Sequence, residues 1–192
     1  MRTVALMIAK KESKRLPDKN FRDFCGKPMF VWNLEKCLDL FDEVYVSSDS
    51  DFILEESKKL GACPIKRPVE LCKSDVPNID VYQHAFEHMD NPDGIVAVKA
   101  DSPTTRSEII QQTKELMERY GYNEIMTTYP IRGYEPKNCV YGSVWALSRE
   151  RLENYLDAWN PEPELLIVDD AVDIHTEEDF KKAEAQLLAR QK

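Results

Sequence analysis

The chain alternates short apolar runs with amphipathic segments along nearly its whole length. The apolar runs are too short for typical helices and predict buried strands, over residues 4–9, 43–47, 63–66, 94–100, 124–129, 140–147 and 165–168. The amphipathic segments carry apolar residues at helical spacing and predict helices over residues 29–41, 50–60, 79–89 and 105–120, after Ser148, and from Thr176 onward. Predicted strands and helices therefore follow one another in turn.

This succession predicts an α/β fold with three layers, α/β/α, in which helices cover both faces of a mostly parallel sheet. The run over residues 94–100 is almost continuously apolar, which is typical of a strand buried in a parallel sheet. The strand over 140–147 follows a segment rich in Pro and Gly and is expected to pair antiparallel to a neighbour. The sequence has no internal repeats, linkers or low-complexity segments, so residues 1–192 are expected to form a single domain.

Cap signals define several predicted helix ends. Thr105-Arg106-Ser107-Glu108 has the pattern of a capping box that opens the helix ending near Tyr120. Thr176-Glu177-Glu178-Asp179 is expected to cap the last helix. The apolar stripe of that last helix is expected to consist of Phe180, Ala183, Leu187 and Leu188.

The composition limits the classes of partner and location. The net charge is −9, which argues against non-specific binding to nucleic acid or to an anionic membrane, since both need a basic surface. No apolar run approaches the roughly 20 residues of a membrane span, and the amino terminus has no signal-peptide pattern. By elimination we expect a cytoplasmic protein.

Five cysteines are scattered along the chain without a C-x-x-C pair, at positions 25, 37, 63, 72 and 139. This spacing fits neither a zinc site nor a disulfide framework. We expect reduced thiols, most of them buried.

A cationic loop follows the first predicted strand, and its positive residues are Lys10, Lys11, Lys14, Arg15 and Lys19, with one acid, Glu12, among them. Open α/β sheets bind ligands in loops at the carboxyl ends of their strands, and ammonium groups there suit a polyphosphate. The alternative is a solvated surface loop. The sequence has neither a G-x-x-x-x-G-K-[ST] loop nor a G-x-G-x-x-G turn, so a P-loop enzyme or a dinucleotide-binding domain is not indicated.

The segment from Ala9 to Asn20 resembles the opening motif of the acylneuraminate cytidylyltransferases, A-R-x-x-S-K-x-[IL]-P-x-K-N. Residues at the motif's defined positions are Ser13, Lys14, Leu16, Pro17, Lys19 and Asn20. Lys10 replaces the usual arginine, and Glu12 and Arg15 stand where many members have a small residue.

Further segments resemble the same family in the same order along the chain. They are Gly26 to Trp32, Val44 to Asp49, Arg67 to Asp75, Val81 to Ala85, Asp101 to Pro103, and Asp173 to Thr176. Ordered matches over most of the chain are far more specific than any single motif.

The resemblance implies a nucleotide-diphospho-sugar transferase fold of the GT-A, Rossmann-like type. It also implies a homodimeric cytidylyltransferase that moves CMP from CTP to a sugar acid such as a nonulosonate, with Mg²⁺ as cofactor and pyrophosphate as the second product. Motif positions assign catalysis to Lys10, Lys14, Lys19 and Asp101, and nucleotide binding to Ala9, Lys10, Ser13, Lys14, Lys19, Asn20, Arg67 and Asp75. Arg67 has an alternative role as an ion-pair partner of Glu70, and Asp75 as a loop cap.

Asp101 and Asp173 are the expected metal ligands, because Mg²⁺ prefers oxygen ligands and is commonly held by one or two carboxylates. Asp101 could instead cap the turn over residues 101–105, and Asp173 could be a surface turn acid. His175 stands where the family usually has a second aspartate. Three roles therefore remain open for it: a metal ligand, a general base, or a residue that takes no part in the reaction.

The residues that bind the acceptor are the part of the site that the resemblance predicts least well. The family usually has an insert before the strand expected over 140–147, and here that insert is reduced to about residues 131–138. Candidate acceptor-binding residues are Ser102, Arg106, Tyr129, Tyr141 and His175. A hairpin over about 129–147 is expected to serve the dimer contact and the substrate.

Two other functions remain open. One is a nucleotidyltransferase of the same fold with another acceptor (KDO, a phosphonate or a phosphosugar) or another NTP. The other is a catalytically degenerate protein that binds nucleotide without turnover, which Lys10, Glu12 and His175 motivate as departures from the family pattern.

Overall fold

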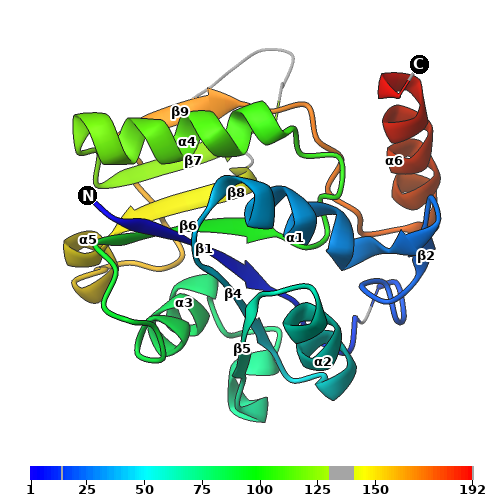
Figure 1. The fold of residues 1–192 in the computed structure, drawn as a ribbon, viewed down its shortest axis with the longest axis horizontal. Helices are drawn as coiled ribbons and strands as arrows, with labels where there is room; N and C mark the ends of the chain where they lie inside the picture. Colours follow the sequence, from blue (N-terminus) through cyan, green and yellow to red (C-terminus); the bar gives the residue numbers. More distant parts are fainter. Residues whose placement is uncertain (14, 130–140, 192) are drawn as a thin grey trace.

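A seven-stranded sheet crosses the computed structural model, which describes residues 1–13, 15–129 and 141–191 (Figure 1). In this part of the chain the strand order is β5-β4-β1-β6-β8-β7-β9. All neighbours pair in parallel except β8, which runs antiparallel to both β6 and β7. The strands are β1 (Thr3–Ile8), β4 (Val44–Ser48), β5 (Cys63–Lys66), β6 (Gly94–Lys99), β7 (Glu124–Thr128), β8 (Tyr141–Ser148) and β9 (Leu165–Val168). The predicted mostly parallel sheet and its one antiparallel strand are confirmed.

Helices cover both faces of the sheet (Figure 1). One face packs against α1 (Met29–Leu40), α2 (Asp51–Lys59) and α4 (Ser107–Tyr120). The opposite face packs against α3 (Asn78–Phe86) and α5 (Arg149–Glu153), while a 3₁₀ turn (Val69–Cys72) precedes α3. The three-layer α/β/α architecture expected from the sequence is therefore confirmed.

The carboxyl-terminal helix packs beside the sheet rather than on it. Helix α6 (Glu177–Arg190) lies against the small hairpin formed by β2 (Asp23–Phe24) and β3 (Lys27–Pro28) (Figure 1). Phe24 and Phe180 meet edge to face there, with ring centroids 5.3 Å apart. This packing fixes the segment before α6 against the loop that follows β1.

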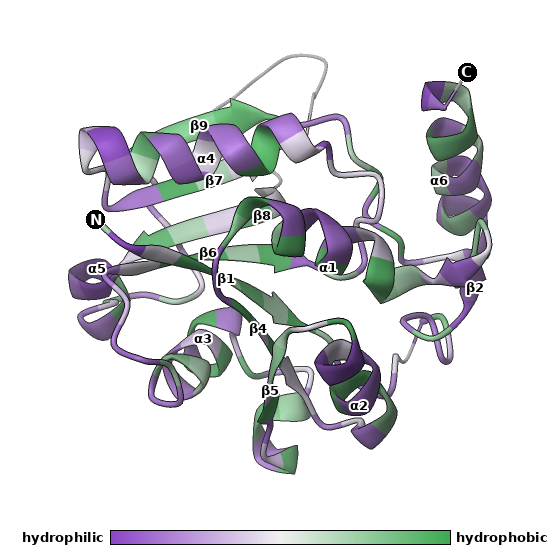
Figure 2. Cartoon of the chain, viewed as in Figure 1, coloured by the Kyte–Doolittle hydropathy of each residue, from purple (hydrophilic) through white to green (hydrophobic). Residues whose placement is uncertain are grey.

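Side chains alternate between the two layers of core, as strand geometry requires. On β1, Ala5 and Met7 face the α1 side, while Val4 and Leu6 face the α3 side. All four are buried, as expected for an interior strand that lies between β4 and β6. Figure 2 shows the same distribution, with hydrophobic residues concentrated on the central strands and mixed faces on the outer helices.

The structure confirms some of the predicted caps and corrects others. Thr176 and Asp179 form the expected capping box of α6. The box predicted for α4 is wrong, because Arg106 is the N-cap and makes no side-chain cap bond. Thr105 instead donates its hydroxyl to the carbonyl of Ser102, closing a turn before the helix. Leu188, placed on the buried stripe of α6, is half exposed.

The prediction of mostly buried thiols is also wrong for the cysteines that the structure describes. All four are free, but only Cys37 is buried, Cys63 is exposed, and Cys25 and Cys72 are intermediate. Burial raises the pKa of the Cys37 thiol to about 12. Cys139 lies outside the described residues.

Within the described ranges, no helix has both the length and the apolar character needed to cross a membrane.

The loops that carry the candidate residues meet at one edge of the sheet. Strands β1, β4, β6 and β9 all end there, because parallel strands share a carboxyl edge. The chain moves outward from β1 to β4 and β5 and then returns to place β6 on the other side of β1. This reversal between β1 and β6 is the point at which open α/β sheets bind ligands.

Two side chains of α1 hold the loop after β6 in place. Asn33 is fully buried and donates its amide to the carbonyls of Lys99 and Ser102, each at 2.8 Å. The ammonium of Lys36 donates to Asn33 Oδ1 at 2.9 Å and to the carbonyls of Pro103 and Thr105 at 2.7 Å. Burial lowers the pKa of Lys36 from 10.5 to about 8.

This lowered pKa predicts a pH-dependent contribution to stability. Between about pH 8 and the ordinary lysine pKa of 10.5, the unfolded chain binds more protons at Lys36 than the folded protein does. The free energy of unfolding should therefore rise with pH across this window relative to Lys36→Met, by up to about 3 kcal/mol. Urea denaturation of both proteins at about pH 7 and about pH 10 measures the difference.

Lys182→Met is the matched control, because Lys182 is exposed on α6. It should follow the wild-type pH dependence. Parallel pH profiles for wild type and Lys36→Met would contradict the assigned environment of Lys36.

Candidate active site

A cavity of about 420 Å³ lies at the carboxyl edge of the sheet, next to the ends of β1 and β6. Two carboxylates line it, those of Asp101 and Asp173. Cations outnumber them, and these are Lys10, Arg15, Lys19, Arg67, Lys73 and Lys99. We call this site the cationic cavity. Its excess of positive charge is opposite in sign to the net charge of −9 on the whole chain, and a cleft of one sign concentrates ligands of the other.

Lys19 is buried, with 7% of the residue exposed. Among the described cations that line the cavity, only Arg67 is more buried. Asp18, with a φ of 53°, turns the chain before it. The ammonium donates to Asp101 Oδ2 at 2.8 Å and to the carbonyl of Ile174 at 2.6 Å. Burial alone raises the pKa of Asp101, but the ammonium groups of Lys19 and Lys99 outweigh it and hold that pKa below its usual value. Asp101 is therefore an ionised carboxylate at neutral pH.

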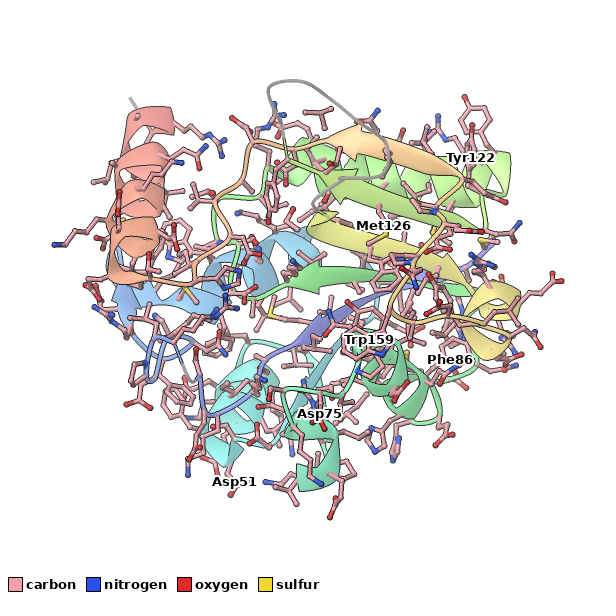
Figure 3. All side chains as sticks on the ribbon, turned by 180° about the vertical axis from the view of Figure 1, so that it is seen from behind. Asp51, Asp75, Phe86, Tyr122, Met126 and Trp159 are labelled. Carbon is pink, nitrogen blue, oxygen red and sulfur yellow. The ribbon has the colours of Figure 1, made fainter. Side chains whose placement is uncertain are left out.

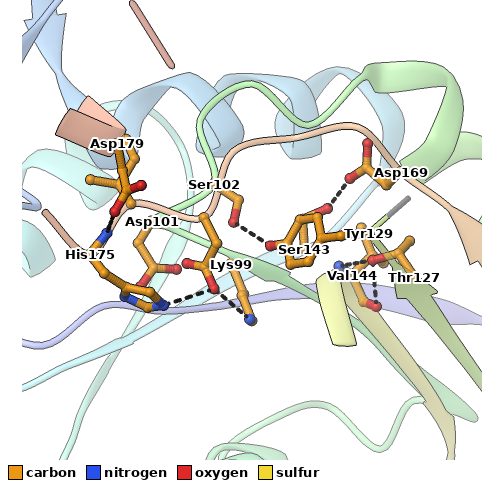
Figure 4. Close-up of polar contacts among 12 residues, drawn as sticks. Lys99, Asp101, Ser102, Thr127, Tyr129, Ser143, Val144, Asp169, His175 and Asp179 are labelled. Carbon is orange, nitrogen blue, oxygen red and sulfur yellow. Dashed lines mark hydrogen bonds and ion pairs between the residues drawn. The ribbon is translucent and has the colours of Figure 1, made fainter. Parts of the chain in front are cut away.

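Asp101, Asp173 and His175 form a cluster of potential metal ligands, with one donor atom from each within 4.8 Å of the others. Asp173 Oδ2 lies 3.2 Å from His175 Nε2 and 3.4 Å from the ammonium of Lys99 (Figure 4). The backbone N–H of His175 donates to Asp179 Oδ2 at 3.0 Å, which ties the cluster to the first turn of α6.

The cluster fits a divalent cation. Asp173 Oδ1 and His175 Nδ1 are buried and have no hydrogen-bond partner among the described residues. Buried polar atoms are normally satisfied, so unpaired ones point to a ligand. Two carboxylates suit Mg²⁺ or Mn²⁺, and an imidazole adds a ligand type that transition metals accept.

Arg67 contributes a buried positive charge to the same cavity. Only 4% of the residue is exposed, and its guanidinium donates to Ser47 Oγ at 3.2 Å and to the Ser47 carbonyl at 2.5 Å. Burial lowers its pKa. The alternative pairing with Glu70 is not observed, and in the described part of the chain no carboxylate forms an ion pair with Arg67. A buried charge without a counter-ion favours an anionic ligand.

The first loop brings further predicted residues to the cationic cavity. Asn20 donates its amide to the carbonyl of Lys10 at 2.9 Å, while Asn20 Oδ1 is buried without a partner in the described residues. The ammonium of Lys10 lies 3.5 Å from the carbonyl of Cys72. Ser13 also lines the cavity, and its hydroxyl accepts from the N–H of Leu16 at 3.5 Å. Lys14 lies outside the described residues.

Two residues predicted to bind nucleotide do not line the cationic cavity. Ala9 is buried and donates its N–H to the carbonyl of Ser47 at 3.1 Å, so it supports the loop from behind. Asp75 is exposed and lines a neighbouring hollow together with Lys10, Lys73 and others. The cap alternative for Asp101 is not observed, because its carboxylate pairs with Lys19.

The predicted acceptor residues are dispersed, and among those whose side chains are described only His175 lines the cationic cavity. Ser102 is fully buried, and its hydroxyl lies 3.5 Å from that of Tyr129 (Figure 4). Burial and the neighbouring Asp173 raise the pKa of Tyr129. Arg106 pairs with Asp170 at 3.4 Å and lines neither this cavity nor the one described next. The side chain of Tyr141 lies outside the described residues.

A second cavity of about 340 Å³ adjoins the first and shares with it Ser74, Val76, Asn78 and Lys99. We call it the aromatic cavity, after its walls of Tyr82, Met126, Trp145, Ala158 and Trp159. Figure 3 shows Met126 on β7 and Trp159 on the segment that follows α5. The aromatic cavity lies on the α3 face of the sheet.

Sequence reasoning missed Lys99, Lys73 and Trp159 as site residues. A signal existed for Lys99, because it is the one charged residue in the apolar run over 94–100 and so ends a buried strand. Trp159 had no such signal, because it lies in a loop of a segment without strong periodicity.

Sequence comparison finds relatives of this chain among known cytidylyltransferases. The chain is 33% identical over 122 residues to the pseudaminic acid cytidylyltransferase of Campylobacter jejuni, which covers 60% of this chain and 53% of the relative. It is 29% identical over 125 residues to the N-acylneuraminate cytidylyltransferase of Oncorhynchus mykiss, which covers 64% of this chain and 29% of the relative. The chain thus spans about half or less of the length of these relatives.

A solved structure of CMP:2-keto-3-deoxy-manno-octonic acid synthetase complexed with CTP has the same fold. The two superpose with a TM-score of 0.77 over the whole of both chains, at 16% sequence identity.

The sequence model of the cytidylyltransferase family matches residues 4–160, which include the cationic loop, Arg67, Asp101 and Trp159. Asp173 and His175 follow the matched range. Because the match covers most of the chain, this protein belongs to the cytidylyltransferase family.

Proposed function

We propose that this protein transfers CMP from CTP to a hydroxyl group of a sugar acid and releases pyrophosphate. The observation that carries the proposal is the cationic cavity, in which positive side chains outnumber acids at the switch point of the sheet. Membership of the cytidylyltransferase family supports CTP as the donor. The names of the relatives support a sugar acid as the acceptor.

The triphosphate would lie among the cations. Lys10, Arg67 and Lys73 line the cavity, whose carboxylates pair with Lys19 and Lys99 instead, and they would neutralise charge on the leaving pyrophosphate. Lys14, by its motif position, would join them. Lys19 is already bonded to Asp101, so it would hold that carboxylate in place and screen its repulsion toward phosphate.

The acceptor hydroxyl would attack the α-phosphorus in line. The new bond joins the acceptor oxygen to the α-phosphorus, the bond from that phosphorus to the bridging oxygen breaks, and the hydroxyl proton is released to solvent. This chemistry depends mainly on positioning and charge neutralisation rather than on a covalent intermediate.

Asp101, Asp173 and His175 would hold the divalent ion, which we take to be Mg²⁺. When bound, the ion supplies Lewis-acid stabilisation of negative charge on the phosphates. Lys99, 3.4 Å from Asp173, would balance the charge of the two acids while the site is empty. We further infer that residues 1–192 form one domain, that the location is cytoplasmic, and, from the family resemblance, that the protein is a homodimer with its contact near residues 129–147, of which 130–140 lie outside the described residues.

The first test is pyrophosphate release from CTP and Mg²⁺ with a panel of nonulosonic and octulosonic acids. Asp101→Asn and Asp173→Asn should each lower kcat by a factor of roughly 10² or more, because each would weaken the binding of the divalent ion that stabilises charge on the phosphates. Lys19→Met should lose activity similarly. Circular dichroism at the assay temperature checks that each variant is folded.

Asp42→Asn is the matched control for this experiment. Asp42 is exposed and precedes β4, at the opposite edge of the sheet. It should keep wild-type turnover. Near-normal turnover in Asp101→Asn would show that the reaction takes place elsewhere.

The second test separates the possible nucleotides by thermal unfolding. A nucleotide at 100 times its Kd should stabilise the protein by about 2.7 kcal/mol. We expect the largest shift for CTP with Mg²⁺ or Mn²⁺, and a smaller shift after EDTA treatment or in Asp173→Asn. A larger shift for GTP, ATP or UTP would assign another donor. CTP binding without pyrophosphate release from any acceptor would favour a protein that binds nucleotide without turnover.

A further inference from the structure

Two of the three histidines in the sequence lie side by side outside both cavities. His84 is in the last turn of α3, and His88 follows the end of that helix by two residues. Their ring centroids are 4.6 Å apart, and the ring planes are tilted by 38°. We call these two residues the histidine pair. The third histidine, His175, belongs to the cluster with Asp101 and Asp173.

The spacing and separation of the histidine pair suit a chelated metal ion. Histidines four residues apart lie on one face of a helical turn, which is a recurring arrangement of two Zn²⁺ ligands. Two imidazoles bound to one ion through nitrogens at about 2.0–2.1 Å would have their ring centres about 4.5–5 Å apart. The observed separation of 4.6 Å is within this range.

The ring of His88 is held in a form that can bind a metal. Its Nδ1 lies 2.8 Å from the carbonyl oxygen of His84. A carbonyl oxygen can only accept, so Nδ1 carries the proton, and Nε2 of the neutral ring keeps its lone pair. Metal-bound histidines commonly donate their other ring N–H to such an acceptor, which fixes the orientation of the ring.

The ring of His84 has a nitrogen that is not satisfied. Its Nδ1 is buried and has no hydrogen-bond partner among the described residues. Since buried polar atoms are normally paired, an unpaired one points to a ligand. Burial and the neighbouring His88 lower the pKa of His84, so its imidazole is neutral at pH 7. The exposed carboxylate of Glu87, which interacts with His84, adds negative charge that would attract a cation.

Contacts with the rest of the protein fix the backbone on either side of the histidine pair. The side-chain amide of Gln83 donates to the carbonyl of Leu152 at 2.8 Å. After the pair, the guanidinium of Arg149 donates to the carbonyls of Asn91 at 2.6 Å and Pro92 at 2.5 Å. Ligand groups that are already held in place lose less conformational freedom when an ion binds.

From this arrangement we propose that His84 and His88 bind a divalent transition-metal ion that accepts imidazole ligands, namely Ni²⁺, Cu²⁺ or Zn²⁺. Two ring nitrogens hold the ion, and water completes its coordination. Mg²⁺ does not bind there, because it prefers oxygen ligands. A bound ion ties the last turn of α3 to the turn that follows it. The site is separate from the reaction site and does not depend on the proposed function.

Isothermal titration calorimetry of the tag-free chain with Ni²⁺ tests the proposal. Excess Mg²⁺ is added to fill the cluster of Asp101, Asp173 and His175, whose carboxylates it prefers. His84→Ala and His88→Ala should each weaken the binding of Ni²⁺ by roughly tenfold or more, because the second ligand of a chelate binds intramolecularly. Circular dichroism checks that each variant is folded.

His175→Ala is the matched control, because it removes the one other histidine of the sequence. It should keep the wild-type affinity of the histidine pair for Ni²⁺. Because Ni²⁺ is paramagnetic, it should broaden the amide NMR signals of the residues around the pair in wild type and in His175→Ala. The same signals should stay sharp in His84→Ala at the same concentration of Ni²⁺.

Two outcomes would overturn the inference. One is equal affinity for Ni²⁺ in wild type and His84→Ala. The other is loss of Ni²⁺ binding in His175→Ala with retention in His88→Ala, which would assign the ion to the reaction site. Pyrophosphate release with CTP and Mg²⁺ should be unchanged in His84→Ala and His88→Ala, because neither residue lines a cavity of the candidate active site. Failure of the proposed reaction would therefore leave the Ni²⁺ result unaffected.

Discussion

The ion pair between Lys19 and Asp101 is the contact on which the site depends. It joins the loop after β1 to the loop after β6, and the second bond of Lys19, to the carbonyl of Ile174, adds the segment before α6. Three segments that are distant in sequence thus meet at one buried ammonium. Removing one partner of a buried pair leaves an uncompensated charge. This contact therefore holds the segments together and also balances the charge of Asp101.

The charge of the cationic cavity is opposite in sign to the net charge of the whole protein. An acidic chain gathers several of its cations at one cavity, where Lys19 and Lys99 hold the pKa of Asp101 below its usual value. A polyanionic substrate therefore meets a local field that attracts it, although the protein as a whole repels it. Buried Arg67, which donates to the hydroxyl and carbonyl of Ser47 and pairs with no carboxylate in the described contacts, adds a charge that a bound anion would balance.

The opposite face of the sheet supports this arrangement without touching the cavity. Asn33 and Lys36 on α1 satisfy four carbonyls of the segment from Lys99 to Thr105. Unsatisfied buried carbonyls would cost about 1–3 kcal/mol each, so these bonds hold the backbone on either side of Asp101 in a single conformation. The position of the Asp101 carboxylate is thus fixed by a helix of the layer on the other side of the sheet.

The sequence by itself determined the order and type of the elements, because hydrophobic periodicity reflects which face of each strand or helix is buried. It also predicted Lys19, Arg67, Asp101 and Asp173 as site residues, and all four line the cationic cavity, since motif spacing fixes where a residue falls relative to a strand end. Their meeting at one edge follows from parallel strands alone.

Tertiary structure alone decided the partners of these residues. The pairing of Lys19 with Asp101 and of Arg67 with Ser47 rather than Glu70 depends on contacts between segments far apart in the chain. The failure of the predicted box at Thr105 is a local effect instead, because the Thr105 hydroxyl donates to the carbonyl of Ser102, three residues before it. Trp159 lines the same cavity as Met126 and Trp145 because its loop folds back on the sheet. No local sequence pattern predicts how that loop folds.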